Sequence, residues 1–299
     1  MTDTSWNGAV GDYLDPAQWT PGDVPLYGSD ASATISACTA TLTGAEPNGV
    51  MLILGRPPGS GAGASPVLAL SNAALGPEMT LDAQGFAVLG VDGYDTNYGT
   101  VNVSPGNVSA AADGQGPGSG NALVVNIGAG SQLNQEGTVS VINSSLITGG
   151  PGTLNNDGQI FIGPGSVGVF GGTFPQNVTG SGTITLAGGT ADGASVGLSD
   201  AAATQTVDLL GGTLSTAVSL QAAIKDWNDN GILMFPSVAV GAVQFNQTSD
   251  AGGDLQLFGA SGQVGGLHLL GSYATADFTV TQGDGGSSIG VTGHPLPSA

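Results

Sequence analysis

Residues 133–141 of this chain read LNQEGTVSV, and residues 154–162 repeat the pattern as LNNDGQIFI. The unit is a polar turn, a glycine and a short strand in which polar and apolar residues alternate. An offset of 21 residues separates these two copies, and a further copy, GTITL, begins at Gly182, 24 residues after Gly158. A period near twenty residues is typical of one coil of a β-solenoid.

An upstream stretch fits the same unit, because GTVNV begins at Gly99, 38 residues before Gly137. We interpret this interval as two periods of nineteen residues. A glycine-rich stretch, DGQGPGSG at residues 113–120, precedes the clearest copies and is expected to interrupt regular structure.

The alternation predicts which side chains point inward. A strand of about five residues cannot bury its apolar face alone, whereas stacked coils build a continuous core. Glycine and asparagine are expected to supply positive-φ corners between strands. The predicted fold class is therefore all-β, a β-solenoid or parallel β-helix, with a β-sandwich as the alternative. The residues predicted to point inward are Val139, Val141, Ile160, Ile162, Ile184 and Leu186.

Three segments are expected along the chain. Residues 1–55 form an N-terminal cap and the first coils, residues 56–218 the solenoid body, and residues 219–299 a short helix with a C-terminal β-region for secretion or docking. The helix is predicted near residues 219–227, where apolar residues recur at helical spacing. These residues are Leu220, Ala223, Ile224 and Trp227.

The charge of the chain excludes several partners. Its 299 residues include 2 Lys and Arg against 22 Asp and Glu, a formal net charge of −20. Nucleic acids and anionic membrane surfaces would be repelled. Because His268 and His294 are the only imidazoles and cationic groups are scarce, the sequence argues against an enzyme. A polysaccharide-active β-helix enzyme with carboxylates from different coils is the remaining enzymatic alternative.

Export is expected from the composition. No run of about 18 apolar residues is present, so membrane insertion is not expected. The opening residues, MTDTSW, lack the basic and apolar regions of a Sec signal. We therefore expect secretion to the extracellular space or cell surface by a non-Sec route, with a type I signal at the C-terminus.

One loop resembles a calcium site. DWNDNG, at residues 226–231, matches the first half of an EF-hand loop, in which Asp226, Asn228 and Asn230 would supply oxygen ligands. Ser237 stands where a bidentate Glu would be expected. Calcium is the predicted cofactor, and a ligand-free Asn-Gly turn ending the helix is the alternative.

Aromatic residues gather near the beginning of the chain, at Trp6, Tyr13 and Trp19. One interpretation is a hydrophobic cap over the first coil, since the open end of a solenoid must be covered. The other is a patch on which a glycan stacks.

The chain opens with the motifs WNG at 6–8, GDYLDPAQW at 11–19 and PGDVP at 21–25, and it closes with DLQL at 254–257, LHLLGSY at 267–273 and ADFTVTQGDGGSSI at 276–289. The opening resembles the start of β-solenoid repeat proteins exported by proteobacteria, and the closing motifs resemble secreted and surface β-repeat proteins of alphaproteobacteria. The resemblance implies an adhesin or extracellular-matrix role.

We therefore expect a structural protein that assembles with itself, head to tail, into extracellular filaments or a biofilm matrix. The alternative is a monomeric surface adhesin or glycan-binding module. Cell-surface or matrix polysaccharide is its expected partner.

Overall fold

The structure is a computed structural model. The parts of the chain that it describes are residues 4–7, 10–20, 22, 24–25, 32–36, 39–45, 47, 50–55, 66–84, 86–92, 94–104, 122–127, 131–149, 151–170, 178–188, 195–198, 201–283 and 286–295.

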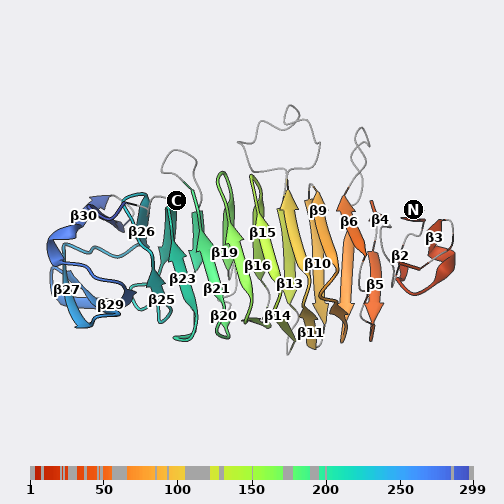
Figure 1. The fold of residues 1–299 in the computed structure, drawn as a ribbon, viewed down its shortest axis with the longest axis horizontal. Helices are drawn as coiled ribbons and strands as arrows, with labels where there is room; N and C mark the ends of the chain where they lie inside the picture. Colours follow the sequence, from red (N-terminus) through yellow and green to blue (C-terminus); the bar gives the residue numbers. More distant parts are fainter. Residues whose placement is uncertain are drawn as a thin grey trace.

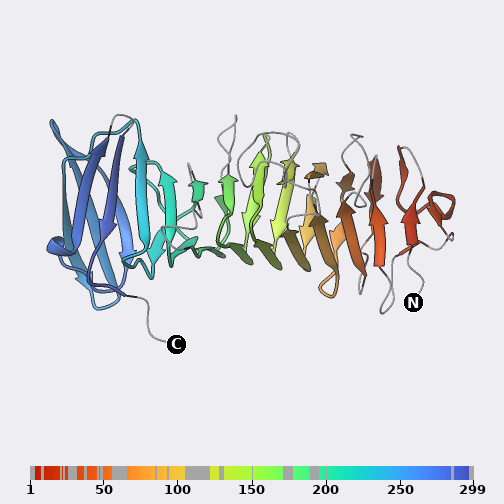
Figure 2. The same cartoon turned by 90° about the horizontal axis from the view of Figure 1, so that it is seen from above.

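The molecule is an elongated stack of coils (Figure 1). Within the described residues the strands form three sheets of 14, 12 and 5 strands. Between residues 67 and 186 consecutive strands belong to different sheets, so a full coil there passes through the 12-stranded, the 5-stranded and then the 14-stranded sheet. Seen from above, the coils follow one another in a row, and longer strands close the C-terminal end (Figure 2).

The strands of the 14-stranded sheet are, in spatial order, β27 (Ala242–Ser249), β28 (Gly252–Gly259), β29 (Gly262–Leu270), β25 (Ala223–Lys225), β23 (Thr206–Leu209), β21 (Thr183–Leu186), β18 (Gln159–Ile162), β15 (Thr138–Val141), β12 (Thr100–Ser104), β9 (Thr80–Gln84), β6 (Met51–Gly55), β4 (Ser32–Ile35), β1 (Thr4–Trp6) and β3 (Trp19–Thr20).

Those of the 12-stranded sheet are β2 (Val10–Asp12), β5 (Thr39–Thr43), β7 (Val67–Ser71), β10 (Phe86–Asp92), β13 (Ala122–Ile127), β16 (Ser145–Gly149), β19 (Val167–Phe170), β22 (Ser195–Leu198), β24 (Gly212–Thr216), β26 (Gly231–Pro236), β31 (Gly286–Val291) and β30 (Phe278–Gly283).

The 5-stranded sheet contains β20 (Val178–Thr179), β17 (Thr153–Asn156), β14 (Gln132–Gln135), β11 (Tyr94–Asn97) and β8 (Ala74–Leu75). Two short 3-10 helices, η1 (Pro16–Gln18) and η2 (Thr275–Asp277), complete the elements of the described residues.

The register confirms the β-solenoid. Val139 pairs with Ile160, and Ile160 pairs with Ile184, which are the offsets of 21 and 24 residues seen in the sequence. All the residues predicted to point inward are buried, so the alternation identified the core correctly. Each coil covers the apolar face of the next, which is how short strands become stable.

The interpretation of the 38-residue interval as two coils is wrong. Thr100 on β12 pairs directly with Thr138 on β15, so these residues belong to neighbouring coils. The interval is one coil that carries a long insertion between β12 and β13. The glycine-rich stretch at residues 113–120 falls in this insertion and lies outside the described residues.

The glycine of the repeat has a different role from the one predicted. Gly137, Gly158 and Gly182 do not have positive φ angles. Each lies so close to the preceding coil that an added Cβ would collide with a backbone carbonyl oxygen; at Gly158 this oxygen belongs to Gly137. Positive-φ corners occur elsewhere, at Asn143 for example. The repeated glycine therefore permits close stacking of coils.

Buried amides tie successive coils together at one corner. The Nε2 of Gln205 donates to the carbonyl oxygens of Asn156 at 2.6 Å and of Thr179 at 2.8 Å. The Nδ2 of Asn156 donates to Oε1 of Gln205 at 2.9 Å. Asn97 and Gln135 make a similar pair, 2.7 Å apart, nearer the N-terminus. The two bonds from Gln205 satisfy backbone carbonyl groups that burial would otherwise leave unpaired.

The predicted helix near residues 219–227 is wrong. Residues Ala223–Lys225 form strand β25, in which Ile224 pairs with Val207 of the preceding coil. Leu220, Ala222 and Ile224 are buried, a period of two rather than a helical period. Pairing with β23 satisfies the backbone and buries Ile224, so tertiary contacts override the local helical spacing.

Antiparallel pairs occur at both ends of the parallel stack: β1 pairs with β3 at the N-terminal end, and the C-terminal antiparallel strands begin after β26. β31 pairs antiparallel with β26, and β30 pairs antiparallel with β31. On the other side β29 runs parallel to β25, and β28 and β27 follow it as antiparallel neighbours. The same sheets therefore run from the N-terminal segment through the body and into the C-terminal β-region.

Candidate functional site

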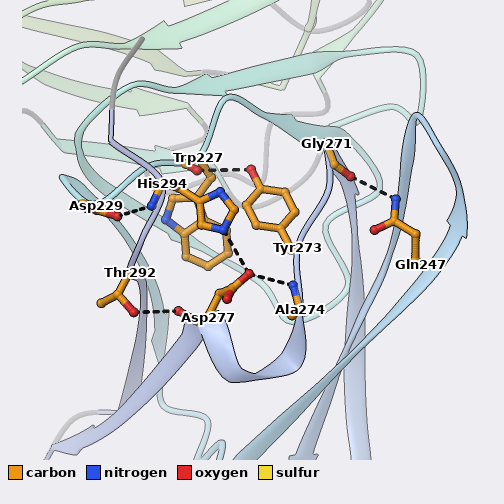
Figure 3. A network of polar contacts seen from close by, with 9 residues as sticks. All are labelled: Trp227, Asp229, Gln247, Gly271, Tyr273, Ala274, Asp277, Thr292 and His294. Carbon is orange, nitrogen blue, oxygen red and sulfur yellow. Dashed lines mark hydrogen bonds and ion pairs between the residues drawn. The ribbon is translucent and has the colours of Figure 1, made fainter. Parts of the chain in front are cut away.

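A polar network holds the C-terminal residues against the last coil (Figure 3). The Nε2 of His294 lies 3.0 Å from Oδ2 of Asp277, and that oxygen also accepts a hydrogen bond of 2.7 Å from the backbone N–H of Ala274. The backbone N–H of His294 donates to Oδ1 of Asp229 at 2.7 Å. We call Asp229, Asp277 and His294 the C-terminal latch.

Aromatic rings support the latch. The imidazole of His294 packs over the ring of Tyr273, with centroids 4.7 Å apart. The hydroxyl of Tyr273 donates to the carbonyl oxygen of Trp227 at 3.1 Å. Trp227 is buried and packs against Phe278 with centroids 5.5 Å apart. The latch therefore joins the loop after β25 to the strand pair β30–β31.

The hydrogen bonds of the latch favour the ionised form of one carboxyl group. The bond from the N–H of Ala274, and then the bond from His294, lower the pKa of Asp277. Burial raises the pKa of the Tyr273 hydroxyl, which keeps this hydrogen-bond donor protonated. The latch thus consists of an anionic acceptor held by fixed donors.

The residues of the predicted calcium loop make contacts of their own. Asp226 has a φ of 52°, and its Oδ2 lies 3.0 Å from Nζ of Lys225. The side-chain oxygen of Asn228 accepts from the N–H of Asn230 at 2.9 Å, closing a turn. The amide nitrogen of Asn228 lies 3.3 Å from the carbonyl oxygen of Asp226. These contacts belong to a tight Asn-Gly turn.

Calcium binding at this loop stays a prediction. Within the described ranges, no group of three or more His, Cys, Asp and Glu side chains is placed to hold a metal ion. Sequence reasoning missed Asp229 of this loop and its contact with His294, because the two residues lie 65 positions apart. The only sign in the sequence that His294 could matter was that the chain has 2 histidines.

Lys225 is the only Lys or Arg among the described residues. Besides Asp226 it approaches Oδ1 of Asp208 on β23, at 3.8 Å. Burial raises the pKa of Asp208, and the charge of Lys225 partly offsets this effect. The lysine side chain is 47% exposed, so the ion pair contributes little to stability.

The three predicted aromatic residues are brought together at the N-terminal end. Trp6 and Tyr13 each meet Trp19 edge to face, with centroids 5.2 and 5.0 Å apart. The indole N–H of Trp19 donates to the carbonyl oxygen of Tyr13, whose hydroxyl donates to that of Pro25. All three rings are buried, and burial raises the pKa of the Tyr13 hydroxyl. The rings thus pack on one another, as a cap requires, and present no open face to a glycan.

The outer face of the 5-stranded sheet carries a polar ladder. Thr96, Asn134, Asn155 and Thr179 occupy equivalent positions on successive coils. The Nδ2 of Asn155 donates to Oδ1 of Asn134 at 3.3 Å, and the Thr179 hydroxyl donates to Oδ1 of Asn155 at 3.1 Å. This row presents aligned amides and hydroxyls along the stack.

Neither a protein-family model nor a curated protein matches the chain. In the ranges that the structure describes, no helix has the length and apolar character needed to cross a bilayer.

Proposed function

We propose that this chain is a secreted structural subunit that joins end to end into extracellular filaments. The observation that carries the proposal is the direction of the strands at the two ends of the 12-stranded sheet. This sheet begins at β2 and ends at β30, at opposite ends of the molecule (Figure 1).

The two edge strands run in the same direction. β2 is parallel to β5 and, through the parallel coils, to β26. β31 reverses the direction and β30 restores it. A second copy translated along the stack would therefore place its β2 beside β30 in the parallel orientation used throughout the sheet. Such a head-to-tail contact does not close on itself and generates a filament.

The edge strands at the C-terminal end lack the features that prevent strand addition, whereas β2 carries one charged residue, Asp12, at its last position. Proteins protect edge strands with charged residues or proline, yet β30 reads FTVTQG and β27, the corresponding edge of the 14-stranded sheet, reads AVQFNQTS. At the other end Val10 on β2 is 73% exposed. These surfaces suit burial against another subunit.

The extracellular setting is supported by the composition and by the resemblance of both termini to bacterial surface proteins. A chain in which 54 of 299 residues are glycine and whose formal net charge is −20 suits an acidic extracellular fibre. Copies of such a chain repel one another until salt or divalent cations screen their charge.

Negative-stain electron microscopy and size-exclusion chromatography over a range of concentrations test the proposal. We expect filaments of uniform width, and we expect Thr279→Lys to shorten them because a lysine on β30 opposes strand addition. Gln159→Lys is the matched control, since Gln159 is exposed in the middle of the 14-stranded sheet and leaves both ends intact. Monomers at every concentration, with and without calcium, would contradict the proposal.

A second candidate is a monomeric glycan-binding module. The polar ladder of Thr96, Asn134, Asn155 and Thr179 favours it, because aligned amides and hydroxyls suit an extended chain of sugar hydroxyls. This candidate predicts single rods in the micrographs and binding on a polysaccharide screen.

A further inference from the structure

The outer face of the 12-stranded sheet carries a continuous apolar row. Five coils contribute one β-branched residue each, in direct register. Their neighbours in sequence, such as Leu68 and Leu146, are buried, so the row points outward, and its members are half-buried. We call it the aliphatic row; it consists of Val67, Val88, Val124, Ile147 and Val169.

The row continues in both directions with small or uncharged residues. Toward the N-terminus it passes through Thr39 to Val10. Toward the C-terminus it passes through Gly197 and Ser215 to Met234, which is 41% exposed. The row itself therefore carries no charged residue from Val10 to Met234.

Charge is sparse on this face. Strands β5, β7, β13, β16, β19, β22, β24 and β26 contain no Asp, Glu, Lys or Arg, whereas β2 and β10 contain one each, Asp12 and Asp92, at their last positions. The equivalent outward row of the 14-stranded sheet includes Asp82, Asp208 and Lys225. In a chain with a formal charge of −20, the face of the aliphatic row is where two copies can approach without opposing carboxylates.

From this we infer that the aliphatic row is the lateral interface between two copies of this chain, packed face to face and antiparallel. A two-fold axis at Val124 sets Val88 against Ile147 and Val67 against Val169. Every side chain of the row then meets an aliphatic side chain of the partner, and Val10 meets Ser215. Facing β-sheets pack in this way about 10 Å apart.

The size of the contact is sufficient. The overlap covers nine strands, from β2 to β24, spaced about 4.8 Å apart, and each strand presents two or more outward positions at intervals of about 7 Å. Each copy then contributes about 500 Å², or about 1,000 Å² for the pair, which is the lower bound for a biological interface. The lateral contact rests on the proposed function and extends it, because it would pair filaments side by side. It uses the outer faces of the strands, that of β2 included, and not the free backbone edges of β2 and β30.

Analytical ultracentrifugation of a Thr279→Lys background tests the inference separately from filament growth. We expect this protein to be a dimer, and we expect Val124→Glu to weaken the dimer at least about tenfold, because two carboxylates would face each other on the axis. Ser140→Glu, on the 14-stranded sheet in the same coil as Val124, is the matched control and should leave the dimer unchanged.

A second variant covers the case in which Val124→Glu fails to fold. Val88→Thr, Val124→Thr and Val169→Thr together keep the side-chain shape and β-propensity but remove the apolar contact, and should also yield monomers. A monomeric Thr279→Lys background, a dimer that survives these changes, or a dimer equally weakened by Ser140→Glu would each overturn the inference. Filaments that remain long in Thr279→Lys would instead contradict the end-to-end joint.

Discussion

Gly158 illustrates how single residues set the spacing of the coils. Its φ is not positive, so its backbone conformation is open to any residue, but a Cβ would collide with the carbonyl oxygen of Gly137 in the preceding coil. The same contact recurs between Gly182 and Gly158. The repeated glycine in the sequence therefore records a distance between coils and not a turn conformation.

We expect Gly158→Ala to destabilise the protein by about 1–3 kcal/mol, because the preceding coil must move to admit the methyl group. Chemical denaturation followed by circular dichroism measures this loss. Gly290→Ala is the matched control, since nothing lies within 4 Å of the added Cβ and the residue is also in a strand. Its stability should stay the same or rise by about 0.5 kcal/mol; equal losses in both variants would argue against close stacking.

At the scale of elements, the C-terminal latch joins strands that are distant in the sequence. Asp277, the last residue of η2, accepts a hydrogen bond from the backbone N–H of Ala274 and contacts the imidazole of His294. Asp229, in the loop after β25, accepts a hydrogen bond from the backbone N–H of His294. The latch therefore holds the strand pair β30–β31 against the last coil. That pair includes the edge proposed for subunit addition, so its stability bears on assembly.

Because of the latch, the free energy of unfolding is expected to fall in acid. The pKa of Asp277 is lowered from 3.8 in the folded state, so its carboxylate stabilises the fold above the unfolded pKa. This stability is lost as the pH falls through the folded pKa, below about pH 4. We expect Asp277→Asn to be less stable than the unmodified chain near neutral pH and nearly equal to it in acid, as measured by urea denaturation.

Thr292→Val is the control for this experiment. It removes the hydrogen bond from the Thr292 hydroxyl to the carbonyl oxygen of Asp277 but leaves the carboxylate in place. It should lower stability by a similar amount at every pH. A difference between Asp277→Asn and the unmodified chain that does not shrink in acid would show that the carboxylate does not contribute in this way.

At the scale of the whole molecule, charge opposes every contact between copies. With a formal charge of −20, association should strengthen as NaCl rises from about 10 mM to about 150 mM, where the screening length falls from about 30 to about 8 Å. Light scattering at fixed protein concentration measures this dependence. Association that weakens with salt would contradict an assembly limited by repulsion.

Calcium is tested in the same assay. At matched ionic strength we expect CaCl₂ to promote association more than NaCl does, and we expect Asp226→Asn to remove the difference, because Asp226 is the only predicted ligand with a negative charge. Equal effects of the two salts would leave screening as the whole explanation and would contradict a calcium site at this loop.

The sequence by itself determined the all-β class, the coil spacing of 21 and 24 residues and the inward side chains, because alternation and periodicity are local properties of a strand. The tertiary structure decided what depends on neighbouring coils. The register of Thr100 with Thr138 showed one long coil where the sequence suggested two, and pairing with β23 made a strand where apolar spacing suggested a helix. The stacking of the coils likewise decides the contacts of the latch, the outward orientation of the aliphatic row and the shared direction of β2 and β30. Contacts between residues of distant coils leave no signal in any short stretch of sequence.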